Sequence, residues 1–253
     1  MPASLPILTF HAVEDRRSVI AISPDVFRRG MERLHESGHR SLSLTKVVEC
    51  LRRGVPFPDR SFVITFDDGY QSVYEKAFPL LDQYAMPATI FLTVGNKEIG
   101  KNAGRLPSRE GRSMLTWSEI GKMRQRGIDF GAHTLTHPDL TRLSQSQIRT
   151  EVHDSKAIIE DKLGIPVTAF AYPYGRCDRR SSEIVSRCFD CACTDSLGLI
   201  KAGSDLFALE RVDSYYLRKN GLFYTMTSRL FPLCIWACNI PRSIRRALFK
   251  KPR

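Results

Sequence analysis

Short apolar runs alternate along most of the chain with stretches in which apolar residues recur every three or four positions. The short runs predict buried β-strands, and the periodic stretches predict amphipathic helices. One such helix is expected to begin after Ser23, a capping residue, with Pro24 in its first turn. A long loop at residues 95–115, which bears Gly, Asn and Ser, interrupts the alternation, and its length suggests a functional role.

Regular alternation of strands and helices predicts a parallel sheet, because each strand is followed by a helix that returns the chain. The expected strands are residues 7–10, 62–66, 88–92, 128–132, 168–171, 190–194 and 209–212. Seven or eight such units favour an α/β fold built as a distorted (β/α)7-8 barrel, with an open doubly wound sheet as the alternative. In both folds the functional side chains are expected at the carboxyl ends of the strands.

Positive charge is concentrated towards the carboxyl-terminal end of the chain. The 253 residues hold 38 Lys and Arg against 27 Asp and Glu, a net charge of +11. Residues 214–253 contain nine of the basic residues and no acidic one, so residues 1–213 are nearly balanced, with 29 basic and 27 acidic residues. The chain is therefore divided into a barrel at residues 1–213 and a basic, partly apolar extension at residues 214–253. No DNA- or RNA-binding motif accompanies the charge, so no nucleic-acid partner is expected.

The extension also carries Trp236 and apolar residues at helical spacing, namely Leu222, Phe223, Met226, Leu230, Phe231, Ile244, Ala247 and Leu248. A basic amphipathic helix of this kind lies on an anionic membrane surface, where Trp is a favoured residue. We therefore expect the extension to bind an anionic membrane surface or a lipid-linked sugar. The alternative is that residues 214–238 form a last helix on the barrel and residues 239–253 a solvated tail.

No apolar run approaches the roughly 18 residues that a membrane-spanning helix requires. The amino-terminal residues carry no basic stretch before their short apolar run, so no cleaved secretory signal is expected. These features predict a cytoplasmic protein that is peripheral on the inner face of the membrane. The seven cysteines are expected to be reduced thiols. Cys188, Cys191 and Cys193 follow the pattern of a buried strand more closely than that of a metal site.

Reactive side chains come directly after or within the expected strands: His11, Asp67 and Asp68, His133 and His137, the turn at residues 172–175, and Arg211 and Asp213. Each has a structural explanation when taken alone, since Asp-Asp-Gly forms turns and two histidines can be exposed on a loop. Thr134 also excludes the zinc-protease pattern H-E-x-x-H. Together, two imidazoles and one carboxylate form a common hydrolytic zinc set, and a second carboxylate can serve as general base.

Three motifs appear in a characteristic order, and they are Thr65-Phe66-Asp67-Asp68-Gly69-Tyr70, His133-Thr134-Leu135-Thr136-His137 and Phe170-Ala171-Tyr172-Pro173-Tyr174-Gly175. They resemble the first three motifs of the polysaccharide deacetylases, carbohydrate esterase family 4. The resemblance implies a distorted β/α barrel and metal-dependent removal of N- or O-acyl groups from sugars. It implies that Asp67 is the general base and that Asp68, His133 and His137 hold one divalent metal, zinc, with cobalt or nickel as alternatives. It also implies that the backbone N–H of Tyr174 helps to hold the oxyanion.

Two positions depart from the family pattern. The third motif usually carries an arginine that orients the base, where this chain has Ala171, and Arg211 is the expected substitute. The family's last motif, Leu-x-His, is absent, because no histidine follows His153. The segment that ends in His11 resembles that strand moved to the front of the chain, as in the poly-N-acetylglucosamine deacetylase branch. His11 is therefore expected to be the general acid, with Asp213 as its orienting carboxylate.

The function expected from these motifs is metal-dependent deacetylation of N-acetylated sugars in a polysaccharide or a lipid-linked glycan. A second interpretation keeps the metal and changes the scissile group, as in a deformylase or another C–N hydrolase of the same fold. A third is a catalytically silent glycan- or lipid-binding protein. The intact pair Asp67 and Asp68 and the pair His133 and His137 count against the third interpretation.

Overall fold

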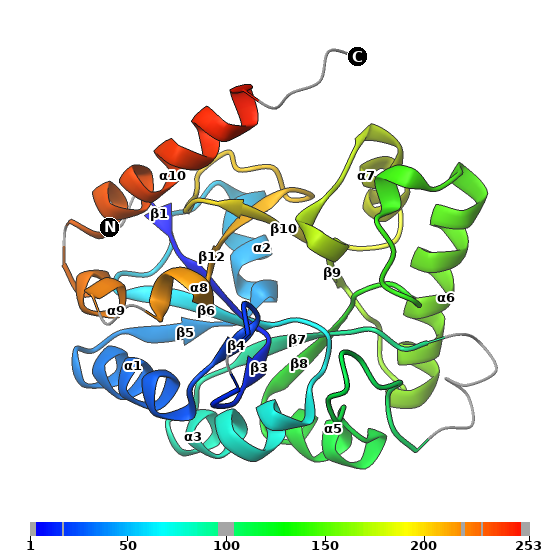
Figure 1. Ribbon diagram of the computed structural model, residues 1–253, viewed down its shortest axis with the longest axis horizontal. Helices are drawn as coiled ribbons and strands as arrows, with labels where there is room; N and C mark the ends of the chain where they lie inside the picture. Colours follow the sequence, from blue (N-terminus) through cyan, green and yellow to red (C-terminus); the bar gives the residue numbers. More distant parts are fainter. Residues whose placement is uncertain (1–3, 17, 96–103, 219–220, 229, 249–253) are drawn as a thin grey trace.

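A closed ring of parallel strands forms the centre of the computed structural model, which describes residues 4–16, 18–95, 104–218, 221–228 and 230–248 (Figure 1). In order around the ring, the strands are β2 (Ile7–Phe10), β12 (Leu209–Asp213), β10 (Cys191–Leu197), β9 (Ala169–Ala171), β8 (Ile128–Ala132), β7 (Ala88–Leu92) and β6 (Ser61–Phe66). β6 pairs with β2 and closes the ring. The expected barrel is therefore confirmed, and the alternative of an open sheet is wrong.

The interior of the barrel is filled by every second residue of the strands. Ile7, Val63, Phe91 and Cys193 belong to one buried cluster, together with residues of α2 (Leu44–Arg53). Because side chains alternate across a strand, the residues two positions further along, such as Thr65 after Val63, continue the same inward face. α2 thus packs against the amino-terminal end of the barrel interior, and the carboxyl-terminal end carries polar side chains.

Helices with well-defined ends cover the outside of the ring. They are α1 (Pro24–Glu36), α3 (Phe78–Gln83), α5 (Trp117–Arg124), α6 (Gln145–Leu163) and α7 (Arg179–Ser186). α1 begins at Pro24 as expected, and α6 begins with a capping box at Ser144 and ends at Gly164 in the left-handed conformation. The single helix expected around residues 74–81 is divided into a π-helical turn, η1 (Val73–Ala77), and α3. Pro79, which lacks a backbone N–H, accounts for the division.

Several very short elements have no counterpart in the apolar pattern. They are β5 (Arg40–Leu42), β1 (Ser4–Leu5) paired with β11 (Ile200–Lys201), β3 (Ala12–Val13) paired with β4 (Ala21–Ile22), and the 3-10 turns η2 (Leu140–Arg142) and η3 (Pro173–Gly175). β5 pairs with the first residues of β6, Ser61–Val63, whereas β7 pairs with Thr65 and Phe66 near the end of β6. Segments of two or three residues are too short to show a hydrophobic period.

Three helices follow the last strand, namely α8 (Ser214–Leu217), α9 (Gly221–Met226) and α10 (Phe231–Leu248). Five of their side chains join the main core of the barrel, and these are Leu217, Phe223, Met226, Phe231 and Ile235. The described part of residues 214–253 therefore shares one core with the barrel at residues 1–213. The alternative of a last helix that covers the barrel requires such packing. No helix among the described residues has the length and apolarity that crossing a bilayer requires.

Replacement of Phe223 by alanine tests this packing. The ring lies against Gly30 of α1 so closely that a Cβ at Gly30 would come within 2.6 Å of it. Phe223→Ala is expected to lower the free energy of unfolding by about 3–5 kcal/mol, because it leaves a cavity in the core. Urea unfolding followed by circular dichroism measures this. The control is the exposed neighbour Tyr224→Ala, whose contact with Arg33 is worth about 1 kcal/mol or less. Equal losses in both variants would contradict the packing of α9 on α1.

Candidate active site

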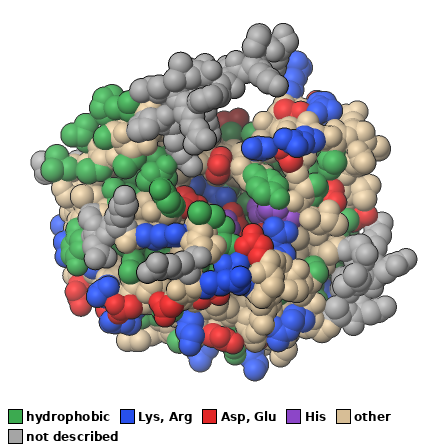
Figure 2. Space-filling model, viewed as in Figure 1, with side chains coloured by type: hydrophobic (Ala, Val, Ile, Leu, Met, Phe, Trp, Pro, Cys, Tyr) green, Lys and Arg blue, Asp and Glu red, His purple; other side chains and the backbone are tan. Residues whose placement is uncertain are grey.

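The carboxyl ends of the strands surround a cavity of about 310 Å³. Figure 2 shows histidine side chains inside a hollow on this face, between acidic and basic ones. The cavity is lined by all eight residues singled out in the sequence, which are His11, Asp67, Asp68, His133, His137, Tyr174, Arg211 and Asp213. A larger cavity of about 590 Å³ lies beside α2, and none of these eight residues lines it.

Asp67 and Asp68 reach this cavity through the turn that ends β6. Asp67 continues the inward face of Val63 and Thr65, as strand alternation requires. Asp68 would then face outward, but its backbone adopts φ 73°, and that of Gly69 adopts φ 83°. A Cβ at Gly69 would also lie 2.7 Å from the side chain of Leu106. The left-handed turn, which Gly69 permits, therefore lets two successive carboxylates face one cavity.

Asp67 is held by Arg211 from β12. The guanidinium donates two hydrogen bonds to the carboxylate, at 2.8 and 2.7 Å, and its Nε donates to the carbonyl of Thr194 at 2.8 Å. Burial alone would raise the pKa of the Asp67 carboxyl, but the charge of Arg211 and its hydrogen bonds hold that pKa well below its usual range. Asp67 is therefore an ionised proton acceptor throughout the neutral range. The structure brings Arg211 to Asp67, the residue that the family resemblance implies as general base.

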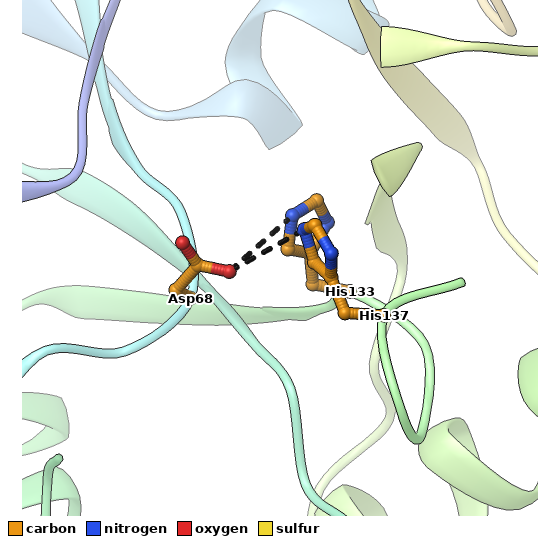
Figure 3. A group of neighbouring side chains, drawn as sticks. All are labelled: Asp68, His133 and His137. Carbon is orange, nitrogen blue, oxygen red and sulfur yellow. Dashed lines mark ion pairs between the residues drawn. The ribbon is translucent and has the colours of Figure 1, made fainter. Parts of the chain in front are cut away.

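Asp68 faces two imidazoles from the loop after β8 (Figure 3). Asp68 Oδ1 lies 3.9 Å from His133 Nε2 and 3.5 Å from His137 Nε2. His133 Nδ1 lies 2.7 Å from the carbonyl oxygen of Ala171, so Nδ1 carries the proton and Nε2 keeps its lone pair. Among the described residues, these are the only three His, Cys, Asp or Glu side chains with ligand atoms all within 4.8 Å of one another.

The loop that carries the two histidines is held in a strained conformation. Thr134 and His137 both have positive φ, at 67° and 62°, which non-glycine residues rarely adopt. The hydroxyl of Thr134 accepts a hydrogen bond from the His137 N–H at 2.9 Å. The carboxylate of Glu151 in α6 accepts from the backbone N–H groups of Leu135 and Thr136, each at 2.9 Å. Glu151 is a supporting residue that the sequence analysis did not identify.

The three side chains fit a divalent cation. Asp68 Oδ1 and His137 Nδ1 are buried and form no hydrogen bond with any described residue. Burial lowers the pKa of His133, and burial together with the neighbouring His133 lowers the pKa of His137 to about 3. Both imidazoles are therefore neutral, the form that binds a metal. One carboxylate oxygen and two imidazole nitrogens leave further positions open, as in hydrolytic zinc sites.

Arg109 is a second residue that the sequence analysis missed. Its Nε lies 3.2 Å from Asp68 Oδ1. It comes from the loop expected to be functional at residues 95–115, of which residues 96–103 lie outside the described part of the chain. The following Arg112 contacts Glu14 and Glu110, each at 2.7 Å, and thereby ties the loop to the barrel rim. The only signal for Arg109 in the sequence was the length of this loop.

The remaining residues surround the two carboxylates. His11 Nε2 lies 3.8 Å from Asp67 Oδ2, and its Nδ1 is buried without a hydrogen-bond partner among the described residues. Tyr174 has φ 56°, and its exposed ring lies edge-on to that of His137 with centroids 4.7 Å apart. Asp213 accepts a hydrogen bond from the N–H of Tyr215 at 2.7 Å and so caps α8. Its role in orienting His11 stays a prediction.

The cysteines expected to be structural have surroundings that suit this role. Cys191 and Cys193 belong to the buried cluster inside the barrel, below the polar rim. Burial raises the pKa of the Cys193 thiol to about 12, which disfavours the thiolate that a metal would bind. All seven cysteines are free thiols, so no disulfide joins them.

Comparisons with known proteins agree with this geometry. The family model described as polysaccharide deacetylase matches residues 54–188. YxkH of Bacillus subtilis (strain 168), which carries the same family name, is 30% identical over 212 residues, 83% of this chain and 71% of that protein. The poly-beta-1,6-N-acetyl-D-glucosamine N-deacetylase of Escherichia coli (strain K12) is 30% identical over 138 residues, 50% of this chain and only 20% of that longer protein.

Among solved structures, the deacetylase PplD of Streptococcus pyogenes, in complex with acetate, has the same fold. It superposes with a TM-score of 0.75 at 28% sequence identity. The match covers 84% of this chain and 93% of PplD, so the similarity extends over most of both chains.

The buried pair of Asp67 and Arg211 generates a prediction for chelator-treated protein. Arg211→Met is expected to lower the free energy of unfolding by about 3–5 kcal/mol at neutral pH, because it leaves a buried carboxylate without its counter-charge. The control is Arg52→Met, which breaks an exposed ion pair with Asp190 and is expected to cost about 1 kcal/mol or less. Urea unfolding of both variants at several pH values measures this.

The pH dependence follows from the depressed pKa of Asp67. In the native protein the pair stabilises the fold above the ordinary aspartate pKa of about 4, and this contribution is lost as the pH falls towards the lower folded-state pKa. In Arg211→Met, no positive charge offsets the burial of Asp67, so the pKa of its carboxyl rises. Acidification then protonates this carboxyl and removes the unpaired buried charge that destabilises the variant. The stability difference should therefore shrink as the pH is lowered, and a constant difference would contradict this account.

Proposed function

The chain belongs to the polysaccharide deacetylase family, and on this premise we propose that it is a metal-dependent hydrolase that removes acetyl groups from N-acetylated sugars. The observation that carries the proposal is a buried, ionised Asp67 beside the cluster of Asp68, His133 and His137. A water molecule in the cavity between them would meet a proton acceptor and a set of metal ligands together. Metal-dependent hydrolysis of an acyl group uses both, and a glycan-binding site needs neither.

Asp68, His133 and His137 would hold the cation, zinc in this proposal, with cobalt or nickel as alternatives. A divalent cation at this position supplies Lewis acidity, which lowers the pKa of water and polarises the acyl carbonyl. The chain's own contribution is to keep both imidazoles neutral and to orient His133 through the carbonyl of Ala171.

Asp67 would accept the proton of the attacking water, because Arg211 keeps it ionised and fixed in orientation. His11 lies beside the same carboxylate, with Nε2 3.8 Å from Asp67 Oδ2, and would donate a proton to the leaving amine nitrogen. The backbone N–H of Tyr174 would donate a hydrogen bond to the oxyanion. The base and the acid are thus separate groups at the ends of neighbouring strands, β6 and β2.

The proposed substrate is an N-acetylated sugar within a polysaccharide or a lipid-linked glycan. The name of the Escherichia coli relative, a deacetylase of poly-beta-1,6-N-acetyl-D-glucosamine, supports N-acetylglucosamine as the sugar. The cavity is open at its rim, where the rings of Tyr174 and Tyr215 are more than half exposed. Exposed aromatic rings suit the apolar face of a pyranose, so they could place a sugar unit over the cluster.

The activity itself is tested on oligomers of N-acetylglucosamine, with release of acetate as the measurement. The native protein is expected to release acetate, to stop when a chelator is added and to recover with zinc. Asp67→Asn should keep its metal but lose at least about a hundredfold in rate, since an amide cannot accept the proton. Asp129→Asn, a carboxylate outside the cavity, is the matched control and should keep the native rate. Acetate release that a chelator does not inhibit, or full activity in Asp67→Asn, would contradict the proposal. Release of formate from N-formyl sugars, without release of acetate from N-acetyl sugars, would make the enzyme a deformylase.

His11→Ala tests the proposed acid. A general acid must carry a proton, so activity falls as the pH rises through its pKa, and the variant should lose this descending limb of the pH–rate profile. Its rate should fall by about a hundredfold or more, with the metal content unchanged. His153→Ala removes a histidine outside the cavity and should leave the profile intact. An unchanged profile in His11→Ala would show that another group supplies the proton.

A further inference from the structure

The outer face of α10 is apolar. Leu233, Trp236 and Ile240 recur at helical spacing on this helix and are 58%, 63% and 39% exposed. The opposite face contains Phe231 and Ile235, which are 5% and 3% exposed and belong to the core. A helix on a protein surface normally buries one apolar face and turns polar residues outward. α10 has a second apolar face, for which the barrel offers no partner among the described residues.

This apolar face is part of a larger patch. Leu230, directly before α10, is 60% exposed, and Tyr224 of α9 is 51% exposed. Figure 2 shows hydrophobic side chains gathered over α9 and α10 at the upper left, on the same face of the molecule as the hollow that contains the histidines. Contiguous exposed patches of this kind mark interaction sites, whereas single exposed apolar residues do not.

The net charge of the carboxyl-terminal sequence indicates which partner covers the patch. α10 continues as a helix to Leu248, and in the sequence Ile244 and Ala247 extend the spacing of Leu233, Trp236 and Ile240. Residues 214–253 carry nine Lys and Arg and no Asp or Glu. Two copies of such a segment would repel each other, so a second copy of this chain is a poor partner. An anionic surface with an apolar interior matches both the charge and the apolar face.

We propose that α10 docks on an anionic phospholipid bilayer, with Leu233, Trp236 and Ile240 in the headgroup region. Helices with a large apolar face and basic flanks bind in the plane of such an interface. Trp236 is a residue type favoured at that depth. The basic residues add attraction to anionic lipid, which salt screens. The catalytic cavity opens on the face that carries the patch, so a glycan held at the membrane would lie within its reach.

Co-sedimentation of the full chain with vesicles tests the proposal without reference to catalysis. The protein should bind vesicles that contain phosphatidylglycerol more tightly than vesicles of phosphatidylcholine alone, and the preference should decrease in high salt. The triple variant Leu233→Ser, Trp236→Ser, Ile240→Ser should bind at least about tenfold more weakly. The control Val55→Ser removes an exposed apolar side chain that follows α2, outside the catalytic cavity, and should bind like the native chain. Equal binding by the two variants, or no preference for anionic lipid, would overturn the proposal.

Fluorescence locates the contact on α10 directly. The chain has two tryptophans, so Trp117→Phe leaves Trp236 as the sole tryptophan, which can be excited selectively over the tyrosines. Its emission should shift to shorter wavelength when anionic vesicles are added, because the ring leaves water. An unshifted emission would overturn the proposal even if the protein sediments with vesicles. Sedimentation velocity without lipid tests whether a second copy of the chain occupies this face instead. A dimer of the native chain that is absent in the triple variant would assign the face to a second copy and overturn the proposal.

Discussion

The pair of Asp67 and Arg211 is the interaction on which both the barrel and its chemistry depend. Their strands, β6 and β12, are the two neighbours of β2, the strand that closes the ring and is followed directly by His11. The bidentate contact therefore spans the closing strand at its carboxyl end. An unpaired charge at this depth costs several kcal/mol, so the pair is stable only when β2 lies in place between its partners. Closure of the barrel, ionisation of Asp67 and the position of His11 therefore depend on one another.

Position 171 explains how an arginine from another strand can pair with Asp67. Ala171 stands where the family usually has that arginine, and it lies fully buried in the barrel interior beside Cys193. Small side chains at both positions leave room for the guanidinium of Arg211, whose Nε reaches the carbonyl of Thr194. The carbonyl of Ala171 meanwhile orients His133. The backbone of one position thus orients His133, while its short side chain admits the partner of Asp67.

The positions of the strands and their ends could be predicted from the sequence because both depend on local apolar runs, and parallel strands bring their carboxyl ends together. The same reasoning led to Arg211. It could not find Glu151 or Arg109, whose contacts depend on loops with positive φ at Thr134 and on a rim held by Arg112. Periodicity also left the carboxyl-terminal helices ambiguous. Spacing identifies apolar positions but not which of two apolar faces meets the barrel, so only the structure separates the buried Ile235 from the exposed Trp236.

The central claim is that strand-end histidines, and not the cysteines deeper in the barrel, bind the metal. X-ray absorption at the zinc edge of the zinc-loaded protein tests it directly. The account predicts a first shell of nitrogen and oxygen at about 2.0–2.1 Å with the outer-shell scattering of two imidazoles. His133→Ala should remove bound zinc or reduce the imidazole contribution to one. A sulfur shell at about 2.3 Å, or a spectrum unchanged in His133→Ala, would contradict the account.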